Sequence, residues 1–99
     1  MSNELPIPPS ARSDKEAREV VRAWVAHRGL HCSLDVDSWG NDPRTVWAIL
    51  LTDVARHVAD ALQQTKGWDK NETVAEIRRV FNAELASPTA EPTGKFHTH

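Results

Sequence analysis

The most regular hydrophobic pattern in the chain runs from residue 43 to residue 65. On a helical wheel of about 100° per residue, the bulky apolar positions fall on one broad arc, formed by Val46, Trp47, Leu50, Leu51, Val54, Val58, Ala61 and Leu62. Asp42 suits the N-cap, Pro43 suits the first helical position, and Gly67 is a stop signal. The pattern therefore predicts a long central helix over residues 43–65.

The side of this helix away from the bulky arc carries small residues instead of a normal charged face. They are spaced four, three and four apart, at Ala48, Thr52, Ala55 and Ala59. A helix that is apolar over most of its circumference is usually buried. We expect the small stripe to pack against another helix or a partner. The alternative is that these residues are exposed and serve only helix propensity.

Residues 19–36 carry a different, alternating pattern. Every second position from Leu30 to Val36 is apolar, which is typical of a half-buried strand. The preceding stretch is rich in β-forming residues, and His27–Gly29 has the length of a hairpin link. We predict a hairpin of residues 19–26 and 30–36, after a short helix that the capping-box pattern at Ser13–Glu16 starts near residues 13–18. A first helix that continues to His27 is the alternative, because helical spacing also fits.

The remaining segments complete an α+β fold. A C-terminal helix is predicted over residues 72–86, with Asp69 or Asn71 as its cap and an apolar stripe at Val74, Ile77, Phe81 and Leu85. Residues 1–12 are rich in proline and are expected to be extended, and residues 88–99 are expected to form a disordered tail. We expect residues 13–87 to fold as a single compact domain.

Composition excludes several classes of function. The 99 residues carry a formal net charge of −2, so no strong field would attract nucleic acid or an anionic membrane. No apolar run approaches the roughly 20 residues of a membrane span, and the N-terminus does not read as a signal peptide. Cys32 is the single cysteine. Together these features lead us to expect a cytoplasmic protein.

The best candidate for chemistry lies on the central helix. Asp53 and His57 are four residues apart, as are Arg56 and Asp60, so each pair lies on one helix face. A histidine held by a carboxylate could act as a general base. The alternatives are a structural histidine and a dimer-interface residue. A helical pair supplies only two ligands, whereas a metal site needs three or four.

Metal sites elsewhere are not supported by the sequence. His27, His31 and Cys32 are close in the hairpin, but strand alternation sends His31 and Cys32 to opposite faces. Asp35 and Asp37 begin a pattern like a calcium loop, but Val46 stands where the bidentate glutamate should be. We therefore expect no metal and no cofactor.

Several segments resemble one family of short bacterial proteins of unknown function. The segments that carry the resemblance are ELPIPPSA, EVVRAWVAHRGLHCSL, WAILLTDVARHVADAL and IRRVFNAELASPT, which together cover roughly residues 4–89. The resemblance implies a bacterial origin and a small α+β domain. It carries no catalytic motif and so implies no activity.

These observations favour a non-enzymatic interaction or regulatory module. We expect the chain to pair with itself, or with another protein, through the stripe Ala48, Thr52, Ala55 and Ala59 and through the edges of the hairpin. The alternative is a small enzyme or ligand-binding protein with its site at Asp53, His57 and Asp60, bounded by Trp24, Trp39 or Trp47.

Overall fold

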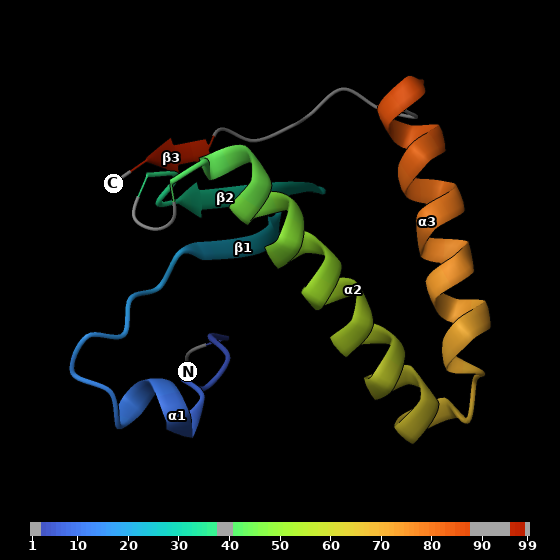
Figure 1. The fold of residues 1–99 in the computed structure, drawn as a ribbon, viewed down its shortest axis with the longest axis horizontal. Coiled ribbons are helices and arrows are strands. Elements are labelled where there is room, and N and C mark those ends of the chain that lie inside the picture. Colours follow the sequence, from blue (N-terminus) through green and yellow to red (C-terminus); the bar gives the residue numbers. More distant parts are fainter. Residues whose placement is uncertain (1–2, 38–40, 88–95, 99) are drawn as a thin grey trace. The chain divides into compact units, whose positions relative to one another are not determined.

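The computed structural model describes residues 3–37, 41–87 and 96–98. Along these residues the chain forms helix α1 (Pro9–Arg12), strands β1 (Val21–Ala26) and β2 (Gly29–Leu34), helices α2 (Pro43–Lys66) and α3 (Lys70–Ala86), and strand β3 (Phe96–Thr98) (Figure 1). The predicted α+β class is confirmed, with a short helix, an antiparallel hairpin and two longer helices in the expected order.

The chain divides into two compact units. The first unit, residues 1–38 and 94–99, contains α1 and the strands, and the second, residues 39–93, contains α2 and α3. The single compact domain expected over residues 13–87 stays a prediction.

The short N-terminal helix lies earlier than its predicted position near residues 13–18. It is α1, Pro9–Arg12, within the segment that was expected to be extended. Proline suits the first helical turn because its missing N–H has no intrahelical acceptor there. Asp14 then accepts a hydrogen bond from the backbone N–H of Glu16 at 2.9 Å, so the Ser13–Glu16 stretch forms turns in place of a capped helix.

The hairpin prediction is confirmed, and the alternative of a first helix reaching His27 is wrong. The register pairs Val21 with Leu34, Ala23 with Cys32 and Val25 with Leu30. Because cross-strand partners share a face, these six residues form one apolar face of the hairpin. Two of them remain largely exposed, with Val25 83% and Leu30 58% accessible.

The hairpin turn is shorter than the predicted three-residue link. Gly29 pairs with Ala26 inside the ladder, so only His27 and Arg28 form the turn. Both have positive φ angles, of 50° and 64°. Positive φ at both central positions is the signature of a type I′ turn, whose twist matches that of the flanking strands.

A third strand was not predicted. Phe96–Thr98 pairs in parallel with β2 and gives the sheet order β1-β2-β3. These three residues lie in the range 88–99 for which a disordered tail was expected, and the rest of that range lies outside the described residues. A strand of this length is held by backbone hydrogen bonds, which leave no side-chain pattern to detect.

Helix α2 confirms the predicted central helix and its end signals. The backbone N–H of Arg44 donates to the Asp42 carboxylate at 3.1 Å, and Pro43 occupies the first turn. Gly67 ends the helix in the left-handed region, with φ of 72°, and its N–H donates to the carbonyl of Gln63 at 2.9 Å. This is the C-terminal stop that glycine makes without steric cost.

Helix α3 begins two residues before its predicted start and is capped by Asp69, one of the two predicted caps. The Asp69 carboxylate accepts a hydrogen bond from the backbone N–H of Glu72 at 2.9 Å. Helices α2 and α3 contact each other and diverge away from the turn that joins them (Figure 1). Among the described residues, Ala59 is the one fully buried apolar residue.

Candidate functional site

The carboxylates of the predicted Asp53–His57–Asp60 edge have cationic partners other than the histidine. Asp60 accepts Lys70 Nζ at 2.8 Å, which ties α2 to the start of α3. Asp53 lies 3.7 Å from a guanidinium nitrogen of Arg56. His57 is exposed, and within the described part of the chain it makes no hydrogen bond to either aspartate. The edge is therefore a row of ion pairs beside an exposed imidazole.

The electrostatics of this edge are centred on Asp60. The hydrogen bond from Lys70 holds the pKa of the Asp60 carboxyl below its ordinary value, and the charges of Lys70 and His57 act in the same direction. Partial desolvation opposes them. Such a carboxyl is ionised at neutral pH and is occupied by an ammonium group, which makes it a poor general base for an external substrate.

Lys70 could not be identified as a partner of Asp60 from the sequence. The two residues are ten apart, and the expected partner at helical spacing was Arg56. The reversal of direction at Gly67–Asp69 places the first residue of α3 beside the last turns of α2. The sequence did predict the turn between the two helices, and this turn brings the end of α2 near the start of α3. It did not indicate which side chains would meet there.

The small stripe on α2 is divided along its length. Ala59 is completely buried and Ala55 is half-buried, whereas Ala48 and Thr52 are exposed. Since α3 is the element that packs against α2, we assign the burial of Ala59 to this helix pair. A stripe without large side chains allows two helix backbones to approach closely.

The exposed half of the stripe borders a shallow hollow of about 630 Å³. Asp53, Ile49 and Arg56 also line it, and all of its lining residues come from Asp42 or α2. The hollow therefore lies between Asp53, one residue of the candidate chemical site, and the exposed residues Ala48 and Thr52 of the small stripe. Of the tryptophans suggested as walls, Trp47 is half-buried on α2, Trp24 belongs to the other unit, and Trp39 lies outside the described residues.

The bulky arc of α2 is more exposed than the sequence predicts. Leu51, Val54 and Val58 are 50%, 48% and 42% accessible, and their spacing places them on one helix face. We call these three residues the α2 face. Among the described residues of the same unit, five further large apolar side chains are at least 40% accessible, namely Ile49, Trp68, Val80, Phe81 and Leu85. On α3 the exposed members lie toward the end that diverges from α2 (Figure 1).

The hairpin side chains that suggested metal are used in another way. The His31 ring nitrogen Nε2 lies 3.1 Å from the carbonyl of Ala26, and the His27 and His31 rings meet edge to face at 6.4 Å. Cys32 is half-buried on the apolar face. Across residues 3–37, 41–87 and 96–98, no three His, Cys, Asp or Glu side chains gather as a metal site would require.

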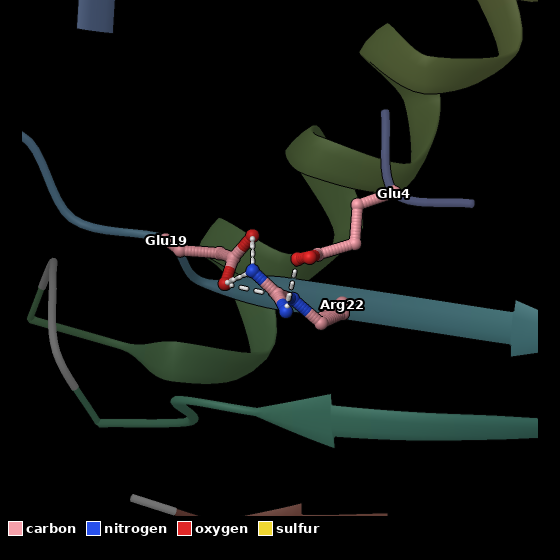
Figure 2. A network of polar contacts seen from close by, with 3 residues as sticks. All are labelled: Glu4, Glu19 and Arg22. Atoms are coloured by element: carbon pink, nitrogen blue, oxygen red, sulfur yellow. Dashed lines mark hydrogen bonds and ion pairs between the residues drawn. The ribbon is translucent and has the colours of Figure 1, made fainter. Parts of the chain in front are cut away.

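A second charged cluster was missed by the sequence analysis. Arg22 on β1 contacts Glu4 at 2.8 Å and Glu19 at 3.0 Å, as Figure 2 shows. The spacing of Glu19 and Arg22 was a local signal for one of these pairs. Glu4 is 18 residues from Arg22, so nothing in the sequence pattern linked them.

No described helix has both the length and the apolar character needed to cross a membrane.

Comparison with known proteins gives one similar solved structure and one matching family model. No curated protein matches it. A solved structure, described as a "putative pyruvate dehydrogenase" from the photosynthetic bacterium Rhodopseudomonas palustrus CGA009, is 32% identical to it. The match has a TM-score of 0.71 and covers 96% of this chain and 95% of that chain. At this identity and coverage the two proteins share one fold.

A family model matches residues 4–89, the range over which the sequence resemblance was found. This confirms the expected relation to a family without a known function. The chain belongs to the family described as a domain of unknown function, DUF5076.

Proposed function

We propose that the protein is a small non-enzymatic interaction module that acts as a homodimer. The observation that carries this proposal is the imbalance between buried and exposed apolar residues. Ala59 is the one fully buried apolar residue among those described, whereas eight large apolar side chains of the α2–α3 unit are at least 40% accessible.

The size of the exposed apolar surface supports a second copy as the partner. Full burial of one such side chain stabilises by about 1.5–3 kcal/mol at ~25 cal/mol per Å², which corresponds to roughly 60–120 Å² each. Eight partly exposed side chains, with aromatic rings at the upper end, thus offer about 300–500 Å² of apolar area. A standard dimer interface buries about 800 Å² per partner, of which about 65% is apolar in homodimers. The total approaches that amount, although Ile49 lies on the other side of α2 from the α2 face.

Two surfaces are suited to this contact. The α2 face is one, since a flat row of aliphatic side chains can pack against the same row of a second copy across a two-fold axis. The free edge of β1 is the other, because β1 lies at the end of the sheet order and β2 is already paired on both sides.

The α2 face can be tested by one charge substitution and a matched control. Val54→Glu places a carboxylate in the centre of the α2 face, and Gln63→Glu adds the same charge at an exposed position on the opposite side of the helix. We expect Val54→Glu to weaken dimerisation at least tenfold in sedimentation velocity and Gln63→Glu to leave it unchanged. Equal dimer affinities for the two variants would remove the α2 face from the interface.

The alternative is a small enzyme or ligand-binding protein with its site at Asp53, His57 and Asp60. The hollow beside Asp53 favours this alternative. If this chain shared the pyruvate dehydrogenase activity named for the similar solved structure, Asp53, His57 and Asp60 would be its candidate site. The ion pairs to Arg56 and Lys70 weigh against it. Turnover of pyruvate by the purified protein that is lost in His57→Gln would support this alternative.

A further inference from the structure

The free edge of β1 presents backbone groups that a neighbouring strand could use. Ala26 and Gly29 close a two-residue turn, so they form a hydrogen-bonded pair. Alternation then directs the backbone N–H groups of Ala23 and Val25 away from β2. The bond from the Asp35 N–H to the Val20 carbonyl fits this alternation. The edge is thus available for antiparallel pairing.

The N-terminal segment lies on the same side of β1 as this edge. Glu4 sits across β1 from β2 and contacts Arg22 Nη1 at 2.8 Å (Figure 2). Glu19 contacts the other nitrogens of the guanidinium at 3.0 and 3.1 Å and so orients it toward Glu4. The hydrogen bonds that the Arg22 guanidinium donates to Glu19 raise the pKa of Arg22, and the charge of Glu4 contributes in the same direction.

This segment is held by charge and not by apolar packing. Leu5 is 89% accessible and Ile7 is 59% accessible. Residues 3–8, the following turn and β1 line an open groove of about 870 Å³. Pro6 and Pro8 have no backbone N–H, so the segment is poorly suited to act as a regular paired strand itself. Covering an edge with a loop is a common way to prevent edge-to-edge association.

We propose that residues 3–8 form a latch over the free edge of β1, closed by the Glu4–Arg22 ion pair, and that opening the latch lets β1 pair antiparallel with β1 of a second copy. This proposal rests on the homodimer proposed above and adds its regulation. Pairing of the two edges would join two three-stranded sheets into one of six strands.

The latch is tested by comparing two neutralising variants of equal charge. Glu4→Gln removes the latch carboxylate. Glu16→Gln is the control, because among the described residues the Glu16 side chain contacts no cationic group and its hydrogen bond is made by its backbone N–H. Exposed ion pairs contribute about 0.2–1 kcal/mol each, and both latches must open before two β1 edges can pair. Glu4→Gln should therefore tighten the dimer by roughly two- to thirtyfold relative to Glu16→Gln. Added salt should tighten the dimer of the control more than that of Glu4→Gln, because salt also opens the latch.

Hydrogen exchange locates the contact that the latch controls. In the dimer of Glu4→Gln, the amides of Ala23 and Val25 should become protected. Equal affinities and equal salt dependence for Glu4→Gln and Glu16→Gln would overturn the latch while the homodimer stands. A dimer in which these two amides exchange freely would overturn edge pairing. If every variant is monomeric at tens of micromolar, in low and high salt, the homodimer fails as well.

Discussion

At the scale of single residues, the two residues of the hairpin turn have an unfavourable backbone conformation. His27 and Arg28 both occupy the left-handed region, which asparagine and glycine adopt far more readily. A side chain in this region costs about 1–2 kcal/mol. The alternating pattern of the strands predicted that a turn would be here, but it gave a link of three residues. The register excludes Gly29 from the turn. The usual residue preferences of such turns do not predict His27 and Arg28 at its two central positions.

Relief of this strain should stabilise the protein. Arg28→Gly is expected to raise the free energy of unfolding by about 1 kcal/mol, because glycine adopts a positive φ without a Cβ clash. Arg28→Ala is the matched control, since it removes the same side chain but keeps the Cβ. Urea unfolding followed by circular dichroism measures both. The strain account is wrong if alanine stabilises as much as glycine.

The Asp60–Lys70 pair predicts a pH dependence of stability. Because the folded-state pKa of Asp60 lies below its ordinary value, the ionised carboxylate is favoured by folding. Its contribution is present above the unfolded-state pKa and is lost as the pH falls through the folded-state pKa. Wild type should be more stable than Asp60→Asn at neutral pH, and the difference should vanish in acid. Both groups are about half exposed, so the effect is small.

Denaturant titrations at neutral and acid pH measure this difference. Asp53→Asn serves as the comparison, because its 3.7 Å pair with Arg56 is longer and lies within one helix. A gap between wild type and Asp60→Asn that is the same at both pH values would show that the Lys70 ion pair does not cause it.

At the scale of elements, the end signals were the most informative part of the sequence. Asp42, Pro43 and Gly67 fixed α2 to within one residue, because cap and stop residues act through local backbone geometry. The N-terminal helix was predicted too late in the chain, because Ser and Asp side chains stabilise turns as readily as they cap helices, and Asp14 does so here. β3 was missed because a three-residue strand is set by its partner's backbone. Among the candidate site residues, the intrahelical spacing was predictable and the contact with Lys70 was not.

The contact between α2 and α3 depends on the small size of Ala59. Ala59→Leu should lower the free energy of unfolding by about 1–3 kcal/mol, since the buried position has no room for added methylenes. Ala48→Leu makes the same change on the same stripe at an exposed position and should have little effect. Thermal unfolding of the two variants measures the difference. Equal effects would mean that the helices do not pack through this end of the stripe.

At the scale of the whole molecule, the chain has apolar surface in both of its units and little that is fully enclosed. The hairpin exposes Val25 and Leu30, and the helix pair exposes the α2 face. A hairpin extended by one three-residue strand and a pair of helices each bury little apolar surface on their own. The sequence predicted these faces from periodicity, but periodicity cannot say what covers them. The proposed answer is a second copy of the chain.

Native mass spectrometry of the protein as purified, without added metal, tests this central claim most directly. It reports the mass of the assembly and of anything bound to it. We expect a species of twice the chain mass with nothing bound. A single chain that carries a metal ion or a small molecule would contradict it, and would turn attention to His57 and the hollow beside Asp53.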